Sequence, residues 1–262
     1  MNIKPYIMIF KAHLSKEMSY RFNFVFSYLL QITRLLIALS VWSLIFSEHR
    51  SIHHYSWHTI AWYYGFSSIF LILCYPSHMF ELQPLIRKGA LSALIIKPLN
   101  IEGHIFAKFA ATKLPAFLIL SVLIFSVFFF LGITFHASLS LPTLFLISIS
   151  FFLTFFFGLF MSVLAFWLIE MWPLKRIFQG CMALLGGGIA PLDLLPESLL
   201  AVALWTPFPY LGYFNVKAIQ GTLPEGELLQ HCIIALGWTA LFSLLFKILW
   251  KVGLQRYEAV NL

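Results

Sequence analysis

Long apolar stretches separated by shorter polar segments run through most of the chain. A bilayer core of about 30 Å needs about 20 mostly apolar residues per helix. Six stretches approach or exceed this length, the fifth being the shortest, so the pattern predicts an all-α polytopic membrane protein with six transmembrane helices. The predicted spans run approximately over residues 22–47, 59–75, 114–133, 144–169, 177–190 and 229–250.

Before the first predicted span, residues 5–20 are neither long enough nor apolar enough to cross a bilayer. On a helical wheel, Lys11 and Ser15 fall on one side of this segment, and Phe10 and Leu14 fall on the other. That division is typical of a helix lying in the membrane interface. We therefore predict an N-terminal interfacial helix here, with a short frayed tail as the alternative.

The longest polar connection, residues 77–113, follows the second predicted span. A short helix is predicted over 77–88, because Gly89 is a natural C-terminal break. The apolar run 90–96 is too short to span, and Pro98 ends it. On physical grounds this helical segment with a basic tip either docks a soluble partner or is a solvated loop.

A second long connection, residues 191–228, is apolar in its first half and lies between the fifth and sixth predicted spans. The glycines at 186–188 loosen the end of the fifth span, and Pro196 with Glu197 suits the first turn of a new helix over 196–205. This helix is too short to cross and too apolar to stand in water. Re-entrant helices buried against the other spans, within 191–215, satisfy both conditions. The prolines that divide the segment are Pro191, Pro196, Pro207 and Pro209.

The composition excludes a water-soluble domain, because 61% of the 262 residues are hydrophobic and only 10% are charged. Soluble domains are about 45 to 50% apolar and about 25% charged. The basic residues stand singly between apolar runs, which argues against nucleic acid as a partner. Cys74, Cys181 and Cys232 are far apart, so neither a disulfide framework nor a zinc site is indicated. Lysines interrupt the first twenty residues, and we expect no cleaved signal peptide there.

The distribution of the 17 Lys and Arg residues predicts the orientation. If the N-terminus is cytoplasmic, Arg50 and Lys217 are the two basic residues outside, and Arg34 lies within the first span. All others fall inside, as the positive-inside rule requires, so both termini are predicted to be cytoplasmic. The residues counted inside are Lys4, Lys11, Lys16, Arg21, Arg87, Lys88, Lys97, Lys108, Lys113, Lys175, Arg176, Lys247, Lys251 and Arg256.

Arg34 is the charged residue that the span pattern does not explain. It lies about 18 Å along the first predicted helix, near the middle of the membrane. Facing lipid, an arginine there would cost about 2.5 to 3.5 kcal/mol or more. We expect it to face the bundle interior, a dimer seam or a wet cavity, and either to contact an anionic or polar substrate or to hold a structural partner.

Four histidines cluster around the first outer loop, and their spacing permits a metal or proton site. An aromatic loop at the membrane interface explains the same composition more simply, and we predict no metal site. The four are His49, His53, His54 and His58.

Four motifs, found in order along the six predicted spans, resemble those of a known family. On these motifs the whole chain resembles a bacterial ABC transporter permease of the type-2 exporter class, the ABC-2 family. The motifs comprise Ile86, Arg87, Lys88, Gly89, Leu91, Leu94, Lys97 and Pro98; then Ala165, Phe166 and Trp167 before Glu170 and Trp172; then Gly187, Pro191, Leu192, Asp193, Leu195, Pro196 and Pro207; and the tail Arg256, Tyr257, Glu258, Ala259 and Val260.

The resemblance implies a single permease domain over residues 1–262, in the bacterial cytoplasmic membrane. It makes 5–20 an elbow helix, 77–113 a coupling region and 191–215 a re-entrant cap. The implied residues that couple the permease to the ATPase are Arg87, Lys88, Gly89, Leu91, Lys97, Pro98, Glu170 and Trp172. The implied cap residues are Gly187, Pro191, Asp193, Pro196 and Pro207, and Arg34 is left as a possible transport-path residue outside the family pattern.

The resemblance also implies partners: a second permease subunit, identical or homologous, and two ATPase subunits that bind ATP and Mg²⁺. This chain has no Gly-Lys dipeptide and hence no phosphate loop, so we expect no nucleotide or other cofactor on it. A membrane enzyme acting on lipid-linked groups is the alternative, but the ten carboxylates are scattered along the chain. A channel would require a repeated filter or a charged ring, and none is visible.

Overall fold

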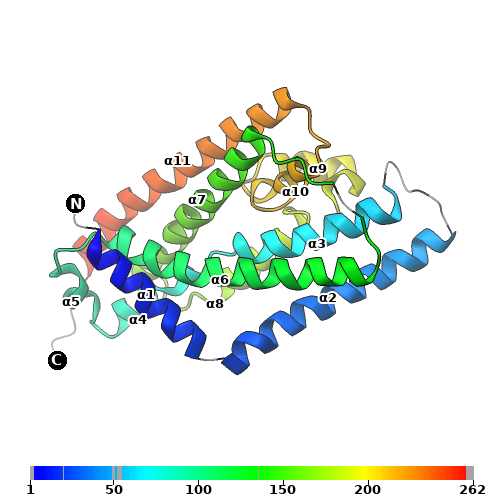
Figure 1. The fold of residues 1–262 in the computed structure, drawn as a ribbon. Helices are drawn as coiled ribbons and strands as arrows, with labels where there is room; N and C mark the ends of the chain where they lie inside the picture. Colours follow the sequence, from blue (N-terminus) through cyan, green and yellow to red (C-terminus); the bar gives the residue numbers. More distant parts are fainter. Residues whose placement is uncertain (1–2, 20, 49–50, 52–54, 135, 258–262) are drawn as a thin grey trace.

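The computed structural model describes residues 3–19, 21–48, 51, 55–134 and 136–257, and this part of the chain folds as a bundle of helices (Figure 1). Five of the described helices belong to segments long and apolar enough to cross a membrane. They confirm the all-helical class, and they coincide with five of the six predicted spans. They are α2 (Arg21–Glu48), α3 (Trp57–Leu73), α6 (Ile101–Phe130), α7 (Leu141–Val163) and α11 (Glu225–Arg256).

The fifth predicted span, over 177–190, is not one long helix. The helix α8 (Trp172–Leu184) has 13 residues, which corresponds to about 20 Å and is shorter than a bilayer core. Three residues after α8 ends, the backbone turns at Gly187, whose φ of +78° lies in the left-handed region. The apolar run read from the sequence therefore contains a helix followed by a glycine turn.

The two long helices α7 and α11 pack side by side and run in the same direction (Figure 1). Near their starts, Cys232 Sγ lies 3.7 Å from the Pro142 carbonyl oxygen. Near their ends, Gly253 packs against the ring of Phe166. Because both helices point the same way, the chain between them must return along the bundle.

This return is made by a broken segment rather than by one helix. It begins with α8, beside the end of α7, and reaches the start of α3, where Gln220 Nε2 donates to the Thr59 carbonyl oxygen at 3.1 Å. There the Ser138 amide also donates to the Ile219 carbonyl oxygen, at 2.7 Å. After α8 the segment contains η3 (Leu192–Leu194), α9 (Glu197–Leu204), η4 (Phe208–Leu211) and α10 (Tyr213–Ile219).

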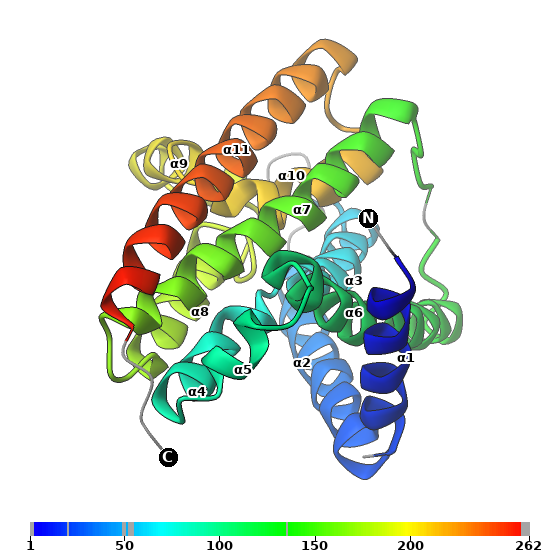
Figure 2. The same cartoon turned by 90° about the vertical axis from the view of Figure 1, so that its left-hand side faces the viewer.

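Both ends of the described chain lie at one end of the bundle, which we call the proximal end (Figures 1 and 2). The start of α3 marks the opposite, distal end. At the proximal end α1 (Lys4–Ser19) has no buried residue and packs along the first turns of α6, where the Asn100 amide donates to the Tyr6 hydroxyl oxygen at 3.0 Å. A helix thus forms over the segment predicted to be interfacial.

The proximal end also holds η1 (Ser77–Phe80), α4 (Leu82–Arg87) and α5 (Leu91–Ile95). The helix predicted over 77–88 is divided at Glu81 into η1 and α4. Its predicted end is confirmed, since α4 stops at Arg87 and Gly89 has a φ of +70°. The exposed Pro98 follows α5 by three residues.

Candidate functional site

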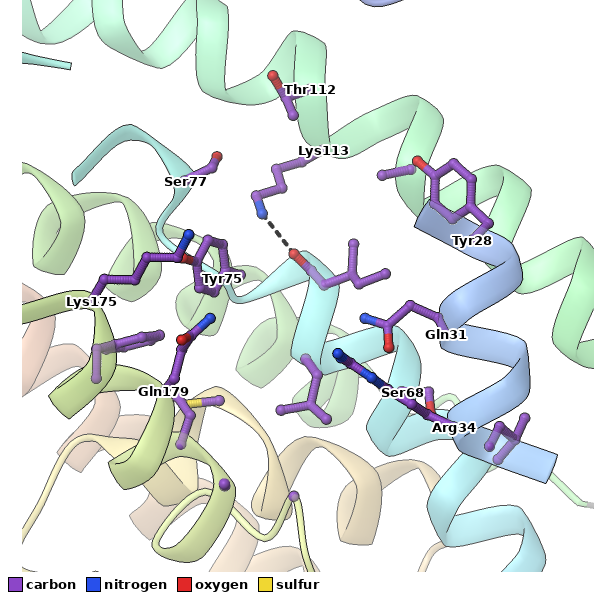
Figure 3. Close-up of a pocket in the computed structure, with 18 of the residues that line it drawn as sticks. Tyr28, Gln31, Arg34, Ser68, Tyr75, Ser77, Thr112, Lys113, Lys175 and Gln179 are labelled. Carbon is purple, nitrogen blue, oxygen red and sulfur yellow. Dashed lines mark hydrogen bonds between the residues drawn. The ribbon is translucent and has the colours of Figure 1, made fainter. Parts of the chain in front are cut away.

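A cavity of about 950 Å³ lies between α2, α3, α6 and α8. It extends from Glu17, Ser77 and Lys175 near the proximal end to Tyr64 and Gly188 deeper in the bundle. Figure 3 shows side chains of α2, α6 and α8 directed into the same space. Its nitrogen-bearing and hydroxyl-bearing lining includes Gln31, Arg34, Ser68, Tyr75, Thr112, Lys113, Lys175, Arg176 and Gln179.

The structure places Arg34 on the wall of this cavity, beside Gln31 and across from Ser68 of α3 (Figure 3). It lies thirteen residues after Arg21, the start of α2, and thus about 20 Å along that helix. No described residue makes a hydrogen bond or ion pair with its guanidinium group. The sequence predicts that Arg34 faces the bundle interior, a dimer seam or a wet cavity, and in this chain it faces a cavity.

Lys113 reaches the cavity from α6, whereas the sequence pattern predicts a cytoplasmic loop at this position. Its Nζ donates to the Ile72 carbonyl oxygen at 2.6 Å and lies 5.5 Å from the centre of the Tyr75 ring. Ile72 belongs to the last turn of α3, and its carbonyl oxygen also accepts from the Tyr75 amide at 3.3 Å. Lys113 therefore ties α6 to the end of α3 and also presents an N–H donor group to the cavity.

Lys175 and Arg176 enter the cavity from the first turns of α8. Lys175 Nζ lies 4.5 Å from the centre of the Trp172 ring, and Arg176 Cζ lies 5.3 Å from it. Stacking on an indole ring holds a cation in place while leaving its N–H groups available. Gln179, one turn later, also points into the cavity (Figure 3).

The distal side of the cavity is closed by the glycine turn after α8. Tyr63 donates through its hydroxyl group to the Gly187 carbonyl oxygen at 2.8 Å, and Tyr64 donates to that of Ile189. A Cβ atom added at Gly187 would lie 2.3 Å from the Tyr63 hydroxyl oxygen. Residues 186–189, of which Gly188 lines the cavity, thus form a tightly fitted turn that we call the roof.

Behind this roof, a charged pair ties together the segments at the distal end. Lys217 Nζ of α10 lies 2.9 Å from a carboxylate oxygen of Asp193 in η3, and the Tyr55 hydroxyl group donates to the same carboxylate at 2.9 Å. Burial and then the Asp193 charge raise the pKa of Tyr55 well above its usual value, so that this hydroxyl keeps its proton. We call Tyr55, Asp193 and Lys217 the distal charge cluster.

Of the predicted cap residues, Gly187 forms the roof and Asp193 belongs to the distal charge cluster. Pro191 is buried just before η3. Pro196 precedes α9 and Pro207 precedes η4, so each marks the start of a short helix. The sequence does not reveal that Lys217 and Tyr55 share Asp193 as a partner, because Asp193 is far from each of them along the chain.

The predicted coupling residues gather at the proximal end. Arg87 Nη1 lies 3.2 Å from Glu170 Oε1, which joins the two proximal loops, and Gln83 Nε2 donates to the Ile169 carbonyl oxygen at 2.9 Å. Trp172 is 54% exposed. Lys88, Lys97 and Pro98 are also exposed, whereas Gly89 is half-buried.

Leu91 differs from the other predicted coupling residues, because it is fully buried. It belongs to an apolar cluster of the proximal end with Leu82, Ile105, Phe109 and Phe246, among others. Its side chain thus packs α5 against the bundle.

The carboxylates of the described interior are paired rather than grouped. Glu81 pairs with Lys108, and Glu17 lies 3.4 Å from His13 one turn before it. The described residues contain no group of three metal-ligating side chains. Of the histidines of the first outer loop, His58 is described, whereas His49, His53 and His54 lie outside the described residues.

Comparison with known protein families identifies the family of this chain. Residues 32–260 match the family model described as ABC-2 family transporter protein. This range covers most of the 262-residue chain. None of the curated proteins compared with the chain matches it.

Proposed function

The chain belongs to the ABC-2 transporter family and is a multi-pass membrane protein; on that premise we propose that it is the permease subunit of an ABC exporter. In this proposal the cavity between α2, α3, α6 and α8 receives the cargo on the cytoplasmic side. ATP hydrolysis on two separate ATPase subunits, which bind ATP and Mg²⁺, drives its movement outward. The family match over residues 32–260 is the observation that carries the proposal.

We further propose that the proximal end is cytoplasmic and that the chain crosses the bacterial cytoplasmic membrane six times. Five crossings are the long helices, and the sixth is the broken return from α8 to α10. The basic residues around α1, α4, α5 and the end of α11 support this orientation by the positive-inside rule. A reporter fused after residue 262 should then be active only on the cytoplasmic side, and external activity would contradict the topology.

The exposed part of the proximal end is proposed to dock the ATPase subunits. Arg87 and Glu170 connect the loops after α3 and α7, so that a push on either loop reaches two cavity-lining regions, α3 and α8. Exposed apolar side chains at Ile96, Ile169 and Trp172 add a surface suited to burial against a partner.

A second permease subunit, identical or homologous, is proposed to lie against the open side of the cavity. The outward faces of α2 are apolar and exposed in this chain, for example at Leu36, Ile37 and Leu44. Such faces meet either lipid or another permease. Arg34 lies on the same helix, next to Leu35, whose side chain is buried in the bundle.

Co-purification with a phosphate-loop ATPase, and ATPase activity that depends on the permease, test this proposal directly. The variant Gly89→Pro should weaken both, because proline cannot adopt the positive φ that ends α4. Gly132→Pro is the matched control, since Gly132 has a φ of +64° in the turn after α6, at the distal end. Equal loss in both variants would indicate general misfolding and would contradict a special role for the α4 end.

A further inference from the structure

We propose that the ligand of the cavity is an organic anion with an apolar body. This inference rests on the proposed function, because it names the class of cargo that the same cavity would carry. It is argued from the charges that line the cavity, from their positions along it, and from its apolar walls.

The permanent charges on the cavity wall are strongly unbalanced. Arg34, Lys175 and Arg176 line it, and no described carboxylate forms an ion pair with any of them. The single carboxylate of the lining, Glu17, lies against His13 of its own helix. Arginine remains protonated in proteins and offers five N–H donors in a planar fork that matches phosphate, sulfate and carboxylate groups. The wall is therefore built to receive negative charge.

These cationic groups are spread along the cavity rather than gathered at its mouth. Lys175 and Arg176 stand at the proximal start of α8, whereas Arg34 lies about 20 Å along α2. Lys113 supplies a further N–H donor on the α6 side (Figure 3). An anion that enters at the proximal end therefore meets donors both at the mouth and deeper in the bundle.

The remaining wall is apolar, and the volume far exceeds that of an inorganic ion. Leu35, Leu71, Phe178 and Met182 line the cavity between the basic groups. Its 950 Å³ lies at the upper end of the range of about 300 to 1,000 Å³ that is typical of pockets for organic ligands. A ligand with both an anionic group and an apolar body would use both kinds of wall.

An organic cation is the competing ligand, because aromatic rings also reach the cavity. Tyr64 and Tyr75 line it and could face a quaternary ammonium group. The same ligand would then lie among Arg34, Lys175 and Arg176, and these like charges would repel it. The charge balance therefore favours the anion.

The experiment measures binding by calorimetry to the full-length chain in an uncharged detergent, without nucleotide. The three probes are hexyl phosphate, hexyltrimethylammonium and inorganic phosphate. We expect hexyl phosphate to bind at least about tenfold more tightly than either of the others, a ratio that corresponds to one charge-assisted contact. Equal binding of the cationic probe would overturn the anion assignment, and equal binding of inorganic phosphate would overturn the apolar body.

Variants then locate the binding site. Arg34→Gln and Arg176→Gln should each weaken hexyl phosphate about tenfold, and Arg34→Lys should retain most of the affinity. Lys251→Gln is the matched control, because this exposed lysine of α11 does not line the cavity. Unchanged affinity in both arginine variants, with correctly folded protein, would overturn the proposal.

This assay separates the inference from the proposed function. A chain that couples to an ATPase but does not prefer hexyl phosphate is a permease with a different cargo class. If the chain binds hexyl phosphate but neither recruits nor stimulates an ATPase, the result supports the anion site and contradicts the proposed function.

Discussion

The distal charge cluster and the cavity both contain basic side chains, but within the described chain only the distal one, Lys217, is paired with a carboxylate. In the distal charge cluster, Lys217 is 2.9 Å from Asp193, and the side chains are only 8% and 22% exposed. In the cavity, Arg34 of α2 and Lys175 and Arg176 of α8 line the same space, and no described carboxylate forms an ion pair with any of them. The distal cation is paired within the described chain, whereas the three cavity cations are not.

The contrast indicates which charges stabilise the fold and which are available to a ligand. Two charges removed from water persist only if each compensates the other, and loss of one then exposes the full desolvation cost of its partner. Charges that line a wet cavity are already solvated, and their removal leaves no buried partner behind. Unfolding measurements can therefore test the comparison one residue at a time.

The largest effect on stability is expected for Lys217→Met, which leaves Asp193 without its cation. We expect the free energy of unfolding to fall by about 3 kcal/mol, the lower end of the range for a broken buried pair, since Asp193 is partly exposed. Denaturant unfolding of the purified chain in an uncharged detergent measures this loss.

The double variant Lys217→Met with Asp193→Asn is the control, because it removes both charges together. It should recover more than half of the lost free energy. If the single and double variants are equally unstable, packing at residue 217 and not charge pairing explains the loss.

A somewhat smaller effect is expected for Gly187→Ala in the roof between the two regions. The substitution puts a Cβ atom 2.3 Å from the Tyr63 hydroxyl oxygen and holds alanine at a φ of +78°. We expect a loss of about 2 kcal/mol in the free energy of unfolding, from backbone strain and steric overlap.

Gly180→Ala in α8 is the matched control, since no atom lies within 4 Å of the added Cβ. It should be neutral or slightly stabilising, because alanine favours a helix more than glycine does. If Gly187→Ala leaves the free energy of unfolding equally unchanged, the roof accommodates a Cβ atom despite the hydrogen bonds of Tyr63 and Tyr64.

The long spans were predictable because their apolar runs exceed what a soluble helix would carry, and α2, α3 and α7 begin within three residues of the prediction. The predicted span over 177–190 is not one long helix, because hydropathy records apolar residues and not backbone direction. Gly187 turns the chain inside this apolar run, and short helices follow it.

The site was predictable only where a residue conflicts with its local surroundings. Arg34 is conspicuous because it is a charge within an apolar helix. Lys113 directly precedes the predicted start of the third span and was read as a boundary charge, whereas α6 already begins at Ile101. The pairing of Lys217 with Asp193 depends on how the return segment folds, which no local pattern records.

The exposed ion pair of Arg87 and Glu170 is intermediate between the buried pair of the distal charge cluster and the unpaired cations of the cavity. Arg87 and Glu170 are 3.2 Å apart, but their side chains are 51% and 65% exposed. Arg87→Glu should therefore cost less than about 1 kcal/mol in the free energy of unfolding, and the swap Arg87→Glu with Glu170→Arg should restore it.

Association with the ATPase should stay weakened in that swap, as measured by co-purification, because we propose that the exposed face of Arg87 meets the partner. Full recovery of the association in the swapped variant would show that Arg87 acts only by joining the two proximal loops.

The smallest effect on stability is expected for Arg34→Gln, and it is the sharpest test of the comparison. No described partner is left unpaired when this guanidinium group is removed, so the free energy of unfolding should change by no more than about 0.5 kcal/mol. Hexyl phosphate binding should weaken about tenfold in the same preparation, whereas Lys217→Met should show the opposite pattern of low stability and, once folded, retained binding. A loss of stability in Arg34→Gln comparable to that of Lys217→Met would mean that Arg34 is a structural charge, and the distinction between the two regions would not hold.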